Sequence, residues 1–413
     1  MTSGERFILI LILGLLSTIG PFSIDMYLPG FLAIAKDLHT SVDEVSYSLS
    51  SFFIGISVGQ LISGPLLDRY GRRTPLIIGL VIYVIASVGC ALASSIEMLI
   101  VLRLFQALGG CVTMVAPRAI VRDAFSVEEN AKILSLLILI LGVSPILAPT
   151  IGSWVIAAVG WNYVFFILAI VTFFVLLAVI FWLRESKAPD PNFSLKPEAI
   201  ISSFITVVRN SQFSTYAFAG GIASAGLFGY LSGSPFVFMK FFGVTEQQYG
   251  WIFASIAAGL IGSSQLNTIV LKRFNSEQIM KAILIAQAVI GVLLVVGTVL
   301  NILGLFGTIF LIFLFLSCQG FTFPNSAALS MAPFTKEAGS ASALMGALQM
   351  GFGSLASAVV GMLNAQTPLP MASVMATCTC IGLVILLAGR RKIRHQIRRE
   401  DLKEETLDLI EKC

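Results

Sequence analysis

Two charged residues lie deep inside apolar stretches of the sequence, where a charge is costly. Asp25 is the one acidic residue among 22 that sits well inside such a stretch, and Arg103 is the one deeply placed base. A carboxylate in a bilayer core costs about 2.5–3.5 kcal/mol on insertion scales, so it is a candidate for function. Burial favours the neutral form of a carboxylate, and a nearby cation favours the charged form. We therefore expect Asp25 and Arg103 to act in proton coupling; the alternative is a static pair that only positions two helices.

The composition requires a membrane around these residues. Hydrophobic residues make up 57% of the 413 residues, charged residues only 12%, and the mean hydropathy is +0.93. Soluble domains carry about 25% charged residues, so a soluble enzyme is excluded. The apolar stretches are continuous rather than alternating, which predicts an all-α polytopic membrane protein. Twelve membrane-spanning helices are expected, near residues 7–32, 44–66, 75–94, 97–120, 133–158, 162–183, 212–239, 247–269, 277–299, 305–329, 338–363 and 370–389.

The distribution of Lys and Arg predicts how these spans are oriented. Of the 26 basic residues, 23 fall on one side of the expected membrane and two on the other. Since cytoplasmic loops are rich in Lys and Arg, both termini are expected in the cytoplasm. Asp25 then lies seven residues before the end of the first span, and Arg103 six residues after the start of the fourth. Both charges are expected roughly 9–10 Å below the outer surface.

A polar stretch near the middle of the chain divides the twelve spans into six and six. We expect a first bundle over residues 1–184, a cytoplasmic linker with an interfacial helix over 185–210, a second bundle over 211–389, and a cytoplasmic basic and amphipathic tail over 390–413. Two halves of this kind, with pseudo-symmetry between them, are typical of transporters built from repeats.

The segment between the second and third spans reads G-P-L-L-D-R-Y-G-R-R over residues 64–73. A tight turn between helices needs glycine, and an acidic side chain there can accept hydrogen bonds from the free amide groups of a neighbouring helix. The order of these residues resembles the signature loop of the major facilitator superfamily. The resemblance implies a conformational gating motif, which here comprises Gly64, Asp68, Arg69, Gly71, Arg72 and Arg73, with Arg122 and Asp123 at the end of the fourth span.

Other segments resemble one branch of that superfamily, the bicyclomycin/chloramphenicol-resistance (Bcr/CflA) drug:proton antiporters. The first span carries I-D-M-Y-L-P over residues 24–29, and the fourth carries R-L-F-Q-A-L-G-G over 103–110. The fifth span contains a variant of the antiporter motif, which the resemblance implies shapes the closed state and prevents proton leak: Gly142, Pro145, Ala148, Pro149 and Gly152. One departure is Trp161-Asn162, where the superfamily usually has Trp-Arg.

In the fold implied by the resemblance, the first, fourth, seventh and tenth spans line the substrate cavity. The residues offered there are mostly apolar or aromatic, which suits an amphiphilic organic molecule, although simple packing explains each of them as well. The candidates are Phe22, Tyr27, Gln106, Met114, Phe228, Tyr230 and Asn325.

We therefore expect a proton-driven exporter of small amphiphilic compounds, such as antibiotics, in the bacterial cytoplasmic membrane. Its partners are the substrate, protons and membrane lipid; no cofactor, no metal, no nucleic acid and a monomeric state are expected. The alternative is a uniporter or symporter for an endogenous metabolite on the same fold. A receptor or membrane enzyme is disfavoured because the chain has two histidines and no G-x-S-x-G motif, and ATP is not the expected drive because no phosphate-binding loop is present.

Overall fold

The computed structural model describes residues 3–125, 127–190, 197–334, 338–363 and 366–411. These residues form helices and no strand. The helices are α1 (Ser3–Asp25), η1 (Leu28–Gly30), α2 (Phe31–Asp37), α3 (Val42–Tyr70), α4 (Arg73–Ala91), α5 (Ile96–Gly110), α6 (Val112–Ala124), α7 (Val127–Val159), α8 (Asn162–Trp182), α9 (Pro197–Arg209), α10 (Ser211–Pro235), η2 (Phe236–Phe241), α11 (Glu246–Val270), α12 (Ser276–Val299), α13 (Gly304–Met331), α14 (Ala338–Met362) and α15 (Leu369–Glu411).

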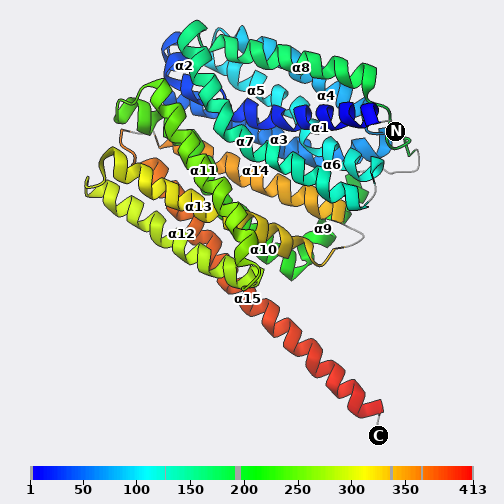
Figure 1. The fold of residues 1–413 in the computed structure, drawn as a ribbon. Coiled ribbons are helices and arrows are strands. Elements are labelled where there is room, and N and C mark those ends of the chain that lie inside the picture. Colours follow the sequence, from blue (N-terminus) through cyan, green and yellow to red (C-terminus); the bar gives the residue numbers. More distant parts are fainter. Residues whose placement is uncertain (1–2, 126, 191–196, 335–337, 364–365, 412–413) are drawn as a thin grey trace.

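Twelve segments of the described chain are long and apolar enough to cross a membrane, which confirms the predicted number of spans. In Figure 1 the helices from α1 to α8, here called the first half, lie above those from α10 to α15, the second half. The halves meet where α3 packs against α14 and α7 packs against α11. The last helix continues beyond the bundle as a single projecting rod (Figure 1).

Several spans are interrupted, and the interruptions follow from the sequence. The first span is not one helix but three pieces, because α1 ends at Asp25 and the chain restarts as η1 and α2. Pro29 lies in η1 and lacks the amide hydrogen that a continuous α-helix would need. The seventh span ends in the π-helix η2, directly after Pro235. The predicted end of the first span at residue 32 is therefore extended, through α2, to Asp37.

The two ends of the bundle differ. The end that carries the α3–α4 turn and the start of α1 is called the basic face, and the end that carries α2 and η2 is called the opposite face. At the opposite face the halves touch, because η1 contacts α10 and α11 while α2 contacts η2. Serine hydroxyls add hydrogen bonds between α3 and α14: Ser50 Oγ lies 2.8 Å from Ser357 Oγ, and Ser354 Oγ donates to the Ser50 carbonyl over 3.1 Å.

Candidate functional site

Asp25 is the last residue of α1, at the break in the first span. Its side chain is 5% exposed, and no hydrogen bond or ion pair with another described residue holds its carboxylate. The break is packed tightly against α7. A Cβ atom added to Gly152 would lie 1.9 Å from the Met26 carbonyl oxygen, so only glycine lets α7 approach this turn. The antiporter segment therefore contacts the turn that holds the predicted proton-coupling acid.

The break that follows Asp25 meets the second half, because η1 contacts both α10 and α11. Tyr230 of α10 and Tyr249 of α11 belong to the same buried cluster as Ile24 and Met26, the two chain neighbours of Asp25. The Tyr249 hydroxyl lies 2.8 Å from Ser234 Oγ, and the rings of both tyrosines pack on Phe253 with centroids 5.8 and 6.1 Å away. The acid thus lies where the two halves meet, in an aromatic environment with few polar groups.

Arg103 lies in the interior of the first half and is 0% exposed. Its Nη1 donates to Gln106 Oε1 over 2.6 Å, and Gln106 Nε2 donates to Ser87 Oγ over 2.7 Å. The guanidinium lies over the rings of Phe52 and Tyr27, 4.0 and 4.3 Å from their centroids. Aromatic faces attract a desolvated cation, so these rings take the place of a counter-ion.

The structure does not bring the two predicted charges together. Although Asp25 and Arg103 are both described, they form no ion pair within 4.0 Å. Tyr27, predicted to contact substrate, instead covers Arg103 and bonds Ser48 through its hydroxyl at 3.3 Å. Gln106, predicted for the same role, is fully buried in the Arg103 network.

A small pocket, with room for about one water molecule, lies in the second half between α10, α13 and α14. No charged side chain lines it; its residues are Ala217, Gly220, Gly221, Ser224, Phe323, Ser326, Ala327, Met345 and Gln349. Met345 and Gln349 come from the eleventh span, which is not among the spans predicted to line the substrate cavity, and no sequence motif marks them.

None of the seven predicted substrate residues lines this pocket. Phe228 packs edge to face on Phe53 of the first half, with centroids 4.6 Å apart. Asn325 donates through Nδ2 to Asn267 Oδ1 over 2.7 Å, which joins α13 to α11. Phe22 and Met114 are half-buried, and Tyr230 is buried with its ring packed on Phe253.

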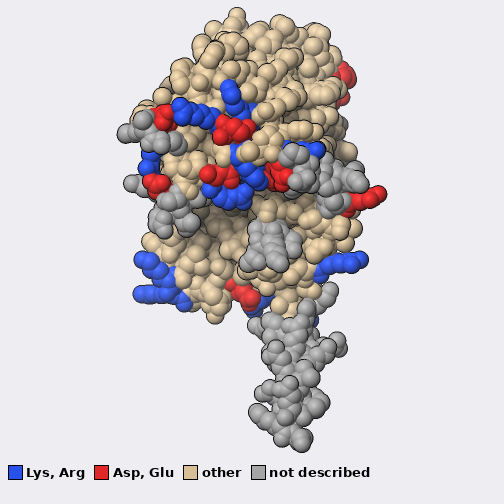
Figure 2. Space-filling view, turned by 90° about the vertical axis from the view of Figure 1, so that its right-hand side faces the viewer, with Lys and Arg blue, Asp and Glu red and all other residues tan. Residues whose placement is uncertain are grey.

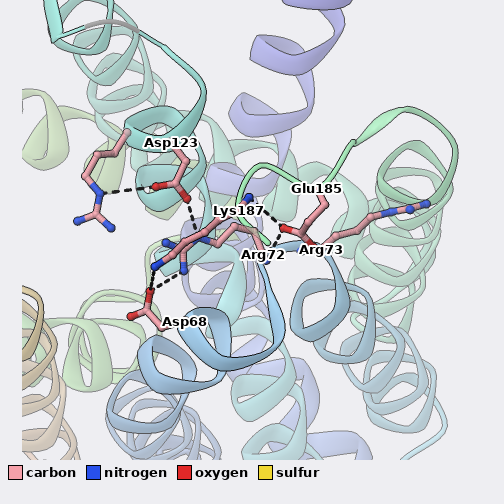
Figure 3. A network of polar contacts seen from close by, with 7 residues as sticks. Asp68, Arg72, Arg73, Asp123, Glu185 and Lys187 are labelled. Carbon is pink, nitrogen blue, oxygen red and sulfur yellow. Dashed lines mark hydrogen bonds and ion pairs between the residues drawn. The ribbon is translucent and has the colours of Figure 1, made fainter. Parts of the chain in front are cut away.

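The predicted gating residues gather at the basic face (Figure 3). Arg72 Nε donates to Asp123 Oδ2 over 2.7 Å, and its Nη1 donates to Asp68 Oδ1 over 2.9 Å. Burial by itself would lower the pKa of Arg72, but the hydrogen bonds and charges of Asp123 and Asp68 outweigh it and raise the pKa above its ordinary value. Arg72 therefore stays charged and ties the ends of α3, α4 and α6 together.

Glu185, which the motif did not include, completes this cluster. It directly follows the sixth span and accepts from the backbone amides of Arg72 and Arg73 over 2.6 and 3.1 Å. These amides are free because they begin α4, so the carboxylate neutralises the positive end of that helix. Gly71 has φ +82°, and a Cβ there would lie 2.6 Å from Glu185 Oε2. Position 71 therefore requires glycine, both for the positive φ of the turn and for the close approach of Glu185.

The remaining members of the motif differ in how firmly they are held. Lys187 Nζ pairs with Asp68 at 3.1 Å, and Arg69 donates to the Asp190 carbonyl over 3.2 Å. Arg122 is 69% exposed, and its ion pair with Asp123 is long, at 3.9 Å between Nε and Oδ1. A Cβ atom added to Gly64 would have no neighbour within 4 Å, so this glycine is not held by packing. In Figure 2, which looks onto the basic face, acidic and basic side chains gather on the part formed by the first half.

The antiporter segment forms the middle of α7, with Pro145 and Pro149 inside the helix. Ala148 is fully buried, whereas an added Cβ at Gly142 would meet its nearest neighbour, Ile261 of α11, at 3.7 Å. The departure at Trp161-Asn162 also has a structural role, since Asn162 Nδ2 donates to the Ala91 carbonyl at the end of α4 over 2.8 Å.

A helical bundle that crosses the membrane twelve times, with a buried acid between its halves and a charged cluster on one face, defines a polytopic membrane transporter. The profile of the Major Facilitator Superfamily matches residues 13–360, so the chain belongs to this superfamily and is a transporter rather than an enzyme.

Similar proteins from other bacteria agree with this assignment to the superfamily. The chain is 33% identical over 387 residues to the uncharacterized MFS-type transporter YdgK of Bacillus subtilis, covering 92% of this chain and 95% of that protein. It is 28% identical over 380 residues to a bicyclomycin resistance protein homolog of Haemophilus influenzae (92% and 95%). It is 30% identical over 385 residues to multidrug resistance protein MdtL of Escherichia coli (91% and 95%). The predicted resemblance to the Bcr/CflA branch is confirmed by these relatives.

Solved structures show the same fold at low sequence identity. The D-xylose–proton symporter matches with a TM-score of 0.73 and 15% identity, over 93% of this chain and 97% of that one. A bacterial homolog of the human lysosomal transporter Spinster, in an inward-facing and occupied conformation, matches with a TM-score of 0.71 and 15% identity over 94% and 96%.

Proposed function

We propose that the protein is a proton-coupled exporter of small amphiphilic organic compounds, antibiotics among them, in the bacterial cytoplasmic membrane. The observation that carries the proposal is Asp25, a buried carboxylate without a fixed partner at the interface of the two halves. The names of the relatives, which refer to bicyclomycin and multidrug resistance, supply the class of substrate.

The distribution of charge indicates how the protein is oriented in the membrane. Lys and Arg are concentrated at the basic face, which is therefore the cytoplasmic side, with both termini on that side. Contact between the halves at the opposite face then closes the protein toward the outside.

Alternating access couples proton entry to substrate export. A proton taken up from outside neutralises Asp25, the halves rock, and the proton leaves toward the cytoplasm before substrate is carried out. One proton moving down 100 mV supplies about 2.3 kcal/mol, before the pH gradient is counted. The cluster around Arg72 and Glu185 holds the basic ends of α3, α4 and α6 together, so that the first half moves as one body.

The test is export by Asp25→Asn, expressed at equal membrane abundance in a host that lacks its own efflux pumps. Asp37→Asn is the matched control, because it removes a charge from the exposed end of the same span and keeps an oxygen for the bond from Trp161 Nε1. The intact protein and Asp37→Asn should protect against at least one compound of an antibiotic panel and should move protons in everted vesicles when that compound is added. Asp25→Asn should do neither.

Two outcomes would count against the proposal. Equal protection by Asp25→Asn would show that another group carries the proton. Protection by none of the three proteins across a broad panel would favour the alternative, a carrier for an endogenous metabolite.

A further inference from the structure

The helices α3 and α14 join the two halves along a seam that does not reach the basic face. Beyond the serine bonds near the opposite face, Ser57 Oγ donates to the Ala347 carbonyl over 2.8 Å. About one turn further along α3, the Gln60 side chain lies against Gly346, where an added Cβ atom would collide with Gln60 Oε1. Residue numbers rise along α3 as they fall along α14, so the two helices run antiparallel in a fixed register.

One turn beyond Gln60 the seam is open. Gln60, Gly64 and Asp68 are four residues apart and therefore share one face of α3, the face that meets α14. A Cβ atom added to Gly64 would nevertheless have no described neighbour within 4 Å, and the same holds for Gly339 in the first turn of α14. Continued for eight residues past Gln60, the antiparallel register places Asp68 level with Ala338, the first residue of α14. The two helices thus diverge toward the basic face, and Asp68 lies on the α3 side of the gap.

A residue of the cytoplasmic linker holds the Asp68 carboxylate in this gap (Figure 3). Lys187 Nζ lies 3.1 Å from Asp68 Oδ1, the same oxygen that accepts from Arg72 Nη1 over 2.9 Å. The Lys187 and Asp68 side chains are 43% and 34% exposed, so the pair is partly shielded from water. The linker is fixed here, because Glu185 binds the free amide groups at the start of α4. It therefore presents an ammonium group to the face of α3 that meets α14 when the seam closes.

We propose that Lys187 is a positioning residue that stabilises the state in which the basic face is open. Closing that face brings Asp68 against the start of α14, whose free amide groups carry a partial positive charge. Two positive groups then compete for one carboxylate, so the Lys187–Asp68 pair has to separate before the seam can close. The pair is intact in the present structure, where the gap is open, and it favours that state. The inference rests on the proposed function in one respect, since it assumes that the two faces open in turn.

The pair gives the linker a role in the transport cycle. An exporter collects its substrate from the cytoplasm, so the state with an open basic face is the one that must be available for loading. The bias toward that state has to be small, because a strong one would prevent the return movement. Partly exposed ion pairs have a suitable strength, since they shift an equilibrium by about 1.5- to 5-fold.

The experiment is hydrogen–deuterium exchange of the purified full-length protein in lipid nanodiscs. The residues Phe236 to Met239 of η2 are buried at the opposite face, so their amide exchange rate follows the population in which that face is open. Lys187→Gln removes the ammonium group and should raise this rate about two- to fivefold, whereas Lys187→Arg keeps the charge and should restore the original rate. Arg184→Gln is the matched control, because Arg184 is a linker cation whose partner, Glu5, belongs to α1 rather than to the face of α3 that meets α14.

A double variant isolates the pair itself. In an Asp68→Asn background, Lys187→Gln should not change the exchange rate further, because the carboxylate that holds the ammonium group is gone. An unchanged rate in Lys187→Gln, an equal rise in Arg184→Gln, or a full rise in the Asp68→Asn background would each overturn the proposal. The measurement needs neither drug nor proton gradient. Failure of drug–proton antiport in the unaltered protein would therefore refute the proposed function without affecting this result.

Discussion

Replacement of Gly152 by alanine tests how closely α7 controls the turn at Asp25. The new Cβ would lie 1.9, 2.8 and 3.1 Å from the carbonyl oxygen, the carbonyl carbon and Cα of Met26. Backbone atoms cannot rotate aside, so α7 or the break in the first span must move. Overpacking costs typically 1–3 kcal/mol, and alanine in a helix recovers roughly 1 kcal/mol relative to glycine. With contact this short we expect a net destabilisation of about 2 kcal/mol.

The matched control is Gly142→Ala, ten residues earlier in the same motif. Its Cβ would meet Ile261 at 3.7 Å, an ordinary contact, so we expect a neutral effect or a gain of up to about 1 kcal/mol. Thermal unfolding of the purified proteins in detergent measures stability, and export at equal membrane abundance measures function. Gly152→Ala should melt at a lower temperature and lose export, since the turn that moves holds Asp25. The reasoning is refuted if Gly152→Ala matches Gly142→Ala in both assays.

Two further substitutions test other parts of the structure. Gly71→Ala should lower the free energy of unfolding by about 2–3 kcal/mol, because a φ of +82° is strained for alanine and the new Cβ would displace the Glu185 carboxylate. Gly64→Ala is the control, since its Cβ would enter open space. Equal melting temperatures for the two variants would contradict this reasoning. A Ser50→Cys, Ser357→Cys pair should cross-link on mild oxidation, since the two hydroxyl oxygens are 2.8 Å apart, and export should stop until a reductant is added. Full export by the cross-linked protein would show that α3 and α14 stay in contact throughout the cycle.

Features that depend on composition and local order could be predicted from the sequence. The twelve spans follow from apolar length alone, and the structure confirms their number. The contacts within the predicted gating motif follow from local sequence: Asp68 and Arg72 are one helical turn apart, and the turn at Gly71 fixes their geometry. Asp123, which also binds Arg72, is far away in the sequence and enters the motif only because the family resemblance implies it.

Features that depend on the rotation of a helix or on distant pairing could not be predicted. The helical rise gives the depth of Asp25 and Arg103, but it does not give the direction in which each side chain points. Arg103 lies against aromatic rings of the first half and forms no ion pair with Asp25, so similar predicted depth did not mean contact. Glu185 lies 113 residues from Arg72, and nothing in its immediate sequence indicates that it binds the amide groups at the start of α4.

The separation of the two charges bears on how coupling works. The groups that hold Arg103 are the rings of Tyr27, Phe52 and Phe165 and the amide of Gln106, all in the first half. In the proposed cycle, a rigid-body movement of one half against the other keeps these contacts, because none of them crosses the interface. Asp25 instead lies at a break whose next piece, η1, contacts the second half, so its surroundings would change as the halves separate. Under the proposed function, this makes Asp25 rather than Arg103 the group that responds to the state of the interface.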